Sequence, residues 1–341
     1  MNVTYYIGAG ASAGALPTIE NMGKKIQECY DDLTNNKNLS LTKDDYSQHN
    51  GLSLLDYELM LFNDLLWLKK ICEDHISVDT YAKKLFIQNN MIETQKLKLI
   101  LTVYFVIEHN YKITIDIRYD NFIASLIDNN TEYLPTNVNI ISWNYDFQFE
   151  KSLKSFLGDD STYTVDDLIN IYPSIINPDH KLNNKFSVFK LNGKVGYRLP
   201  NYYSYETFIE TNYPEINKDF MIAILTKYRL FSTATNRKLL LSFAWENTPE
   251  KRQTIEFAKQ KTKGTEILVV IGYSFPYVNR EIDRDIIRSM PELKKVYFQA
   301  PDDYPLEYIQ SFECIIPNCK ERGIQLIPIN KTRQFFIPSE L

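Results

Sequence analysis

The sequence lacks the residue patterns of several common kinds of site. Only the last two of its four cysteines are close together, and the four are Cys29, Cys72, Cys314 and Cys319. A structural zinc site of the usual kind needs two such pairs. Neither HExxH nor GxSxG occurs, and the histidines are scattered, so zinc-protease and serine-hydrolase chemistry have no support. We predict no metal site, and we interpret the cysteines as buried or idle thiols in a reducing compartment.

Long apolar segments and a strong positive charge are absent as well. No apolar run approaches the ~18–20 residues that span a bilayer, and the N-terminus has no leader pattern of basic and then apolar residues. The net charge is −5, whereas a large nucleic-acid surface needs clustered Lys and Arg. We therefore expect a soluble cytoplasmic protein with no membrane segment and no strong nucleic-acid signal.

The apolar sequence that is present suffices for a large core, since 44% of the 341 residues are hydrophobic. Segments with the composition of strands alternate with helical segments over much of the chain. The expected strands are 3–7, 137–143, 186–191, 238–243, 266–272, 294–299 and 324–329. This alternation predicts an α/β fold: a Rossmann-like, mainly parallel sheet with helices on both faces.

Residues from about 54 to 130 have a different texture, because apolar residues recur there at helical spacing. The helices expected in this block are about 54–77, 79–91, 93–112 and 119–129. Pro and Gly are too sparse for a hinge, and no internal repeat is visible. We predict a single domain, residues 1–341, with this block as a helical insertion.

A glycine-rich stretch, GAGASA at residues 8–13, directly follows the first expected strand. It fits GxGxxA, in which the glycines permit a tight turn and a close approach of backbone to a pyrophosphate, while N–H groups face the phosphates. Small residues at any tight strand–helix turn would give the same string. Unlike an ordinary dehydrogenase site, the following helix is broken early by Pro17, and no second strand follows within about twenty residues.

Four separated stretches together resemble the sirtuin superfamily. In order, they are GAGAS at 8–12 with the loop at Pro17, SWNYD at 142–146, KLNG at 190–193 and GYSF at 272–275. The resemblance implies an NAD pocket in which the glycine turn holds the phosphates and the proline loop covers the nicotinamide ribose. The residues that it implies for NAD binding are Gly8, Ala9, Gly10, Ser12, Pro17, Gly272, Ser274 and Gln299.

The chain also departs from the sirtuin pattern. The paired cysteines of the zinc module and the arginine after the proline loop are missing, and Asn192 occupies the position of the catalytic histidine. The chain is similar to the NAD-degrading sirtuin-like proteins of bacterial antiphage systems, rather than to lysine deacetylases, because it combines a helical insertion and the GYSF stretch with the lack of a zinc module.

The resemblance implies that the catalytic residues are Asn144, Asp146 and Asn192. The nicotinamide–ribose bond has a cationic leaving group, so its cleavage needs no general acid and passes through an oxocarbenium-like state. Asn144 can hold a water or a ribose hydroxyl, and Asp146 can supply negative charge near that state. Asn192 cannot accept a proton at neutral pH, and loss of a general base typically costs ~10²–10⁴-fold in rate.

Each of these polar residues also has a structural interpretation. Asp146 would cap a helix that begins there, and Ser274 would cap the helix expected near residue 279. Asn192 would be a turn residue before Gly193.

Two functions of different classes are compatible with these features. The first is an NAD hydrolase that forms nicotinamide and ADP-ribose and acts as an antiphage effector, as a homo-oligomer or with a partner protein from the same system. The second is a catalytically weak module that binds NAD or ADP-ribose and scaffolds a partner such as an ATPase. A protein deacylase is disfavoured by the missing zinc module and the missing base.

Overall fold

The described part of the chain forms two compact units, Met1–Ala15 with Ile115–Lys194 and Ala244–Leu341, and Leu16–Thr114 with Val195–Phe243. The computed structural model describes residues 1–36, 39, 41, 52–111, 115–127, 134–157, 164–174, 182–198, 205–207, 217–233, 238–302 and 304–341. No helix in these ranges has the length and apolar character of a membrane span.

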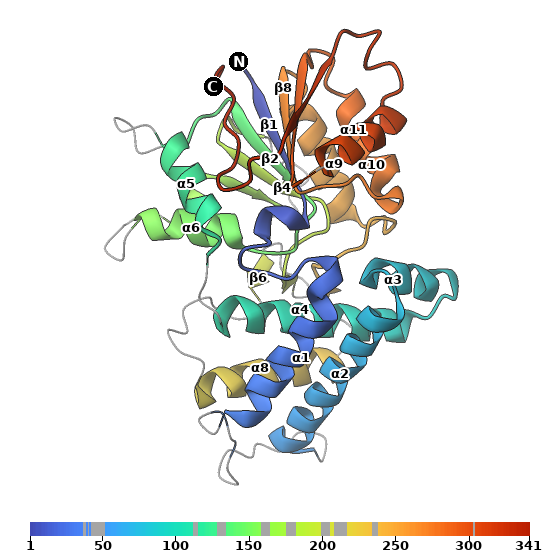
Figure 1. Ribbon diagram of the computed structural model, residues 1–341. Coiled ribbons are helices and arrows are strands. Elements are labelled where there is room, and N and C mark those ends of the chain that lie inside the picture. Colours follow the sequence, from blue (N-terminus) through green and yellow to red (C-terminus); the bar gives the residue numbers. More distant parts are fainter. Residues whose placement is uncertain are drawn as a thin grey trace. The chain divides into compact units, whose positions relative to one another are not determined.

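The first unit is built on a seven-stranded sheet with the strand order β10-β9-β8-β1-β2-β4-β3 (Figure 1). All neighbouring strands in it are parallel. The bounds are β1 Val3–Ile7, β2 Val138–Ser142, β3 Asn170–Tyr172, β4 Ser187–Lys190, β8 Ile267–Ile271, β9 Lys295–Gln299 and β10 Gln325–Ile329. The predicted parallel α/β sheet is therefore confirmed.

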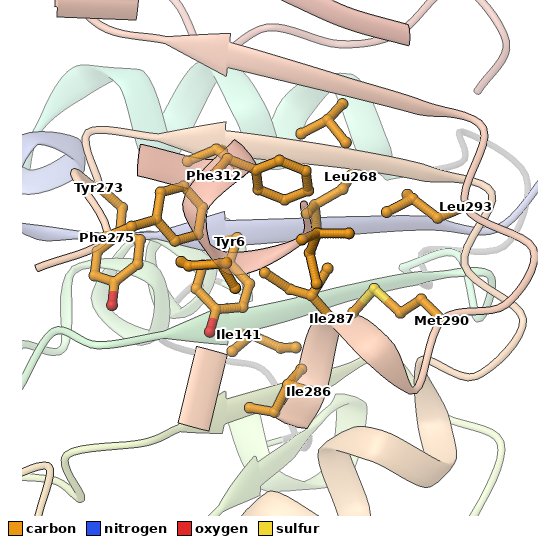
Figure 2. Packing of buried hydrophobic residues seen from close by; sticks show 14 of the residues in the cluster. Tyr6, Ile141, Leu268, Tyr273, Phe275, Ile286, Ile287, Met290, Leu293 and Phe312 are labelled. Carbon is orange, nitrogen blue, oxygen red and sulfur yellow. The ribbon is translucent and has the colours of Figure 1, made fainter. Parts of the chain in front are cut away.

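Helices cover both faces of this sheet, which explains why β1, β2 and β8 are buried along their whole length (Figure 1). On one face Tyr5 of β1 packs edge-on against Phe122, with 4.6 Å between ring centroids. On the other face Tyr6 packs among residues such as Ile286 and Phe312 (Figure 2). The helices of the first face are α5 (Ile117–Leu126), α6 (Gln148–Leu157) and the short α7 (Val165–Leu168), and those of the second are α9 (Pro249–Lys261), α10 (Arg280–Arg288) and α11 (Tyr304–Ile315).

The second unit is mostly helical. Its helices are α1 (Met22–Asn35), α2 (Leu54–Asp74), α3 (Val78–Ile87), α4 (Met91–Tyr111) and α8 (Lys218–Thr233). A small sheet in the order β6-β5-β7 joins Tyr205–Thr207, Gly196–Arg198 and Lys238–Leu239 in antiparallel fashion. Ser53 and Asp56 form a capping box at the start of α2, and Tyr228 of α8 donates to Asp64 of α2 at 2.6 Å.

Two segments differ from the sequence-based expectation. The strand expected at 238–243 is short, because only Lys238 and Leu239 pair, and they pair antiparallel in the small sheet. The helix expected at 119–129 is α5, which packs in the sheet-bearing unit through Phe122 and Ile123. The single domain with an insertion at about 54–130 stays a prediction.

Candidate functional site

The predicted site residues of the first unit lie at or near the carboxyl ends of five strands, of which Gln299 ends β9. Gly8 follows β1, Asn144 comes two residues after β2, Asn192 comes two residues after β4, and Gly272 follows β8. From β1 the chain continues to β2, β4 and β3 on one side, whereas β8, β9 and β10 lie on the other. Open α/β sheets bind ligands at such a switch point, outside the carboxyl ends of the strands.

The bare backbone at the glycine turn is required by the loop that follows β8. Gly10 donates its N–H to the carbonyl of Gly272 at 3.1 Å. A Cβ on Gly8 would lie 2.6 Å from the carbonyl oxygen of Gly272, and one on Gly10 would lie 2.8 Å from the Cα of Gly272. Gly272 itself has φ +56°, in the left-handed region that favours glycine. On the open side of the turn, Ala9 and Ala13 are exposed.

Ser12 connects the turn to the two polar residues after β2. Its buried Oγ donates to Oδ2 of Asp146 at 2.7 Å, accepts from Nδ2 of Asn144 at 3.3 Å and lies 3.1 Å from the hydroxyl of Tyr119. The hydroxyl therefore positions Asn144 and Asp146, and the predicted contact of Ser12 with a phosphate stays a prediction. Tyr119 gave no signal in the sequence, because it lies in a segment with ordinary helical periodicity.

The amide of Asn144 has one possible orientation. Its Nδ2 donates to the carbonyl of Gly8 at 3.0 Å, and a carbonyl oxygen only accepts. The amide oxygen therefore points to the other side, where none of the described residues donates to it. Asn144 is 8% exposed, so its side chain is largely shielded from bulk water, and its oxygen could accept a hydrogen bond from a small ligand.

Asp146 has a structural role that is compatible with a catalytic one. Its Oδ1 accepts from the backbone N–H of Gln148 at 3.1 Å, which forms an Asx-type turn just before α6, two residues earlier than the start of the helix. Burial raises the pKa of Asp146, although the charge of Lys190 and the bond from Ser12 act in the opposite direction.

Lys190, the last residue of β4, is a buried cation beneath this part of the site. It donates to the backbone carbonyl of Asp146 and forms an ion pair with Glu150. Lys190 was not predicted as a site residue and appears above only within the KLNG stretch, because a lysine at a strand end is usually on the surface.

Asn192 carries an unsatisfied polar atom. Its Nδ2 donates to the carbonyl of Trp143 at 3.2 Å, while its Oδ1 is buried and has no hydrogen-bond partner among the described residues. Leaving a buried acceptor unpaired costs about 1–3 kcal/mol. The turn interpretation is also realised, since Gly193 follows with φ +74°.

Ser274 is exposed in a loop with two left-handed residues, Gly272 and Phe275, at φ +56° and +55°. The Phe275 ring is buried against Tyr6 and Phe312, which offsets the conformational cost of a positive φ in a residue with a side chain. The residue before α10 is Asn279, so Ser274 lies too early to cap that helix.

The structure leaves two further predicted NAD contacts, those of Gln299 and Pro17, untested. Both ends of the Gln299 amide are already bonded to the C-terminal segment: Nε2 donates to Lys331 at 2.5 Å and to Gln334 at 2.7 Å, and Oε1 accepts from Phe336 at 3.0 Å. Pro17 belongs to the second unit. The NAD contacts assigned to both residues stay predictions.

Asp283 of α10 is a residue that the sequence analysis missed. Its Oδ1 accepts from the Tyr6 hydroxyl at 2.5 Å and from Trp143 Nε1 at 3.0 Å, and its Oδ2 accepts from the Tyr273 hydroxyl at 2.8 Å. These aromatic residues stand next to or close to Gly8, Asn144 and Gly272 in the chain, and Figure 2 shows Tyr6 and Tyr273 in the same packed cluster.

Because Asp283 is fully buried, its pKa is raised to about 7. A sequence signal existed, since this Asp lies on the same helical face as Ile286 and Ile287.

Asp116 and Arg118 hold the outer side of the glycine turn. Arg118 Nη2 donates to the carbonyls of Gly10 and Ala11 at 3.2 and 3.1 Å, and Asp116 accepts from the N–H of Gly14 at 2.9 Å. The two side chains form an ion pair at 2.5 Å. Neither residue was predicted as part of the site, because their segment reads as part of the helical insertion in the sequence.

The described residues contain no group of His, Cys, Asp and Glu that could hold a metal ion. None of the four cysteines forms a disulfide; Cys29 and Cys319 are buried and Cys314 is exposed.

Comparisons with known proteins give matches among solved structures only. No protein-family model matches this chain, and no curated protein matches it. Among solved structures, Sir2Tm bound to a propionylated peptide is 12% identical, with 94% of this chain and 93% of that chain covered and a TM-score of 0.35. A Sir2 variant with a deacetylated p53 peptide and 3′-O-acetyl ADP ribose is 12% identical, with 95% and 94% covered and a TM-score of 0.34.

Proposed function

We propose that the first unit binds NAD at the carboxyl edge of its sheet and hydrolyses it to nicotinamide and ADP-ribose. One observation carries the proposal: the ends of β1, β2, β4 and β8 bring the bare turn at Gly8, the Ser12-linked pair Asn144 and Asp146, and the unsatisfied amide of Asn192 to one edge. Structural packing accounts for the glycines, but it does not account for the unpaired buried oxygen of Asn192 at the edge of the sheet where Asp146 is also buried.

The residues present fit this substrate. Ala9 and Ala13 are exposed residues, which leaves the turn accessible to phosphates, and the exposed Ser274 has a hydroxyl donor suited to a phosphate or ribose oxygen. The amide oxygens of Asn144 and Asn192 are acceptors, which suits the hydroxyl groups of ribose or a water.

The proposed reaction is a displacement at the anomeric carbon of the nicotinamide ribose. The bond from C1′ to the nicotinamide nitrogen breaks, its electron pair leaves with neutral nicotinamide, and a water oxygen forms the new bond to C1′. The proton of that water passes to solvent. The carboxylate of Asp146 stabilises the positive charge that develops on the ribose.

The biological role that we propose is that of an antiphage effector. It rests on the likeness of the GAGAS, SWNYD and GYSF stretches, with the helical segments and the missing zinc module, to sirtuin-like proteins of such systems. In this role the chain acts as a homo-oligomer or together with a partner protein of the same system.

A second candidate function is favoured by Asn192. Because an amide takes no proton at neutral pH, the same pocket would serve a module that binds NAD or ADP-ribose without turnover and scaffolds a partner such as an ATPase.

Two measurements on the purified chain separate these functions: nicotinamide release from NAD and the heat of NAD binding. Hydrolysis predicts release that Asn144→Ala reduces by about a hundredfold, as for other groups that act in a transition state. The matched control is Asn170→Ala, an asparagine at the opposite end of the same sheet, where β3 begins, and it should match the unaltered chain. Binding without release favours the scaffold, and the absence of both contradicts both functions.

A further inference from the structure

Two asparagine side chains at the site present the same kind of atom. Asn144 donates from Nδ2 to the carbonyl of Gly8, and Asn192 donates from Nδ2 to the carbonyl of Trp143. Since a carbonyl oxygen cannot donate, neither amide can be turned around without placing two acceptors against each other. Both residues are therefore fixed with an amide oxygen as the group left over for a ligand.

The two asparagines are linked through adjacent residues of one segment. Trp143, which accepts from Asn192, directly precedes Asn144, and β2 and β4 are neighbouring parallel strands. Both side chains are more than nine-tenths buried, at 8% and 6% exposure. The Oδ1 of Asn192 is buried without a partner among the described residues, and an unpaired acceptor in such a place is normally satisfied by a water or by a ligand donor.

We propose that the amide oxygens of Asn144 and Asn192 form a pair of acceptors that holds the attacking water by its two hydrogens. This inference rests on the proposed NAD hydrolysis and specifies how that reaction proceeds without a histidine. A water that donates both hydrogens keeps its lone pairs on the opposite side, where they point away from the protein amides and toward the electrophile.

The carboxylate of Asp146 is not the base in this scheme. Its Oδ2 accepts from the Ser12 hydroxyl and its Oδ1 accepts from the N–H of Gln148, and these bonds hold the carboxylate in place to stabilise the developing positive charge. Because an oxocarbenium-like centre is strongly electrophilic, a positioned neutral water suffices. The water loses its proton after the new C–O bond has formed, and this proton leaves through solvent rather than through a side chain.

The first test is the pH profile of kcat. If no protein base takes the proton, kcat of Asp283→Asn, which lacks the carboxyl that itself titrates near pH 7, changes less than about threefold between pH 6 and pH 9. If kcat of this variant instead falls about tenfold for each pH unit below a midpoint in this range, a titrating base is at work and the inference is overturned.

The second test measures the choice between nucleophiles. In water–methanol mixtures the products are ADP-ribose and its methyl glycoside, and methanol can donate to only one of the two acceptors. Asn192→Leu removes one acceptor at similar side-chain volume. It is expected to lower kcat about tenfold, to shift the product ratio toward the methyl glycoside, and to leave the Kd for NAD within about threefold.

The outcomes distinguish this inference from the proposed function. Nicotinamide release with an unchanged product ratio in Asn192→Leu overturns the pair of acceptors and leaves NAD hydrolysis standing. NAD binding without any release by the unaltered chain contradicts hydrolysis, and the inference fails with it. If Asn192→Leu does not fold, Asn192→Ser, with its shorter hydroxyl, takes its place with the same expected direction.

Discussion

At the scale of single residues, Asp283 positions the site by binding three aromatic residues that adjoin it in the chain. Its carboxylate is buried in an apolar cluster, and its partners are hydroxyl and indole groups of Tyr6, Trp143 and Tyr273 rather than a cation. Such a group favours its neutral form, because burial disfavours the charge more than neutral donors stabilise it. The arrangement fixes three loops of the site at a cost in stability that depends on pH.

The charge on Asp283 is expected to lower stability as the pH rises. Its pKa is about 4 in an unfolded chain and about 7 in the folded one. Between these values the unfolded state releases its proton first, so the free energy of unfolding falls from pH 4 to pH 7, by on the order of 4 kcal/mol for this group alone. Denaturant unfolding of the unaltered chain and Asp283→Asn at both values tests this. Equal slopes of stability against pH would contradict it.

The glycines at 8, 10 and 272 give a steric prediction. Gly272→Ala is expected to cost about 2–4 kcal/mol, because its Cβ would lie 2.5 Å from the backbone of Gly10 and φ is positive. Gly323→Ala is the matched control: φ is +70°, but nothing lies within 4 Å of its Cβ, so only about 1 kcal/mol is expected. Urea unfolding measures both costs, and similar values for the two variants would rule out the steric conflict.

At the scale of elements, the start of α5 serves the glycine turn as well as its own helix. Asp116 caps α5 by accepting from the N–H of Arg118 at 3.1 Å and also accepts from Gly14. Burial alone would raise the pKa of Asp116, but the hydrogen bonds and charge of Arg118 hold it below its usual value. Its contribution to stability is therefore present at neutral pH and lost as the pH falls through the lowered pKa.

Removing this carboxylate is expected to cost more than removing an ordinary cap. Asp116→Ala leaves Arg118 with half of its partners, and we expect a loss of about 3 kcal/mol at pH 7. Thr248→Ala, which removes only the cap of α9, should cost about 1 kcal/mol. Thermal unfolding at a series of pH values from pH 7 downward provides the comparison, and a cost of Asp116→Ala that never diminishes as the pH falls to the acid limit of folding would contradict the electrostatic explanation.

Elements with a strong pattern were predictable, and elements that depend on long-range pairing were not. The uniformly apolar segment of β8 and the helical periodicity of α2 and α4 gave their positions within a few residues. In contrast, β3 and β5 are three residues long, too short for a periodic signal. The apolar run from Leu239 to Leu241 is buried, but burial alone does not make a strand.

At the scale of the whole molecule, the sequence indicated which residues lie at the edge of the sheet but not how they are held there. The strand ends after β1, β2, β4 and β8 were recognisable from apolar runs followed by polar residues. The partners that fix them, Tyr119, Arg118 and Asp283, come from helices distant in sequence. Such contacts depend on the packing of complete elements, which single-sequence periodicity does not encode.

The most direct measurement is backbone hydrogen exchange of the full chain with and without NAD. If NAD binds at the carboxyl edge of the parallel sheet, exchange should slow in peptides that cover residues 8–14, 142–147 and 272–275. Helices α1, α2, α3, α4 and α8 of the second unit serve as the internal reference. Protection confined to those reference helices, or none at saturating NAD, would contradict a nucleotide site at this edge.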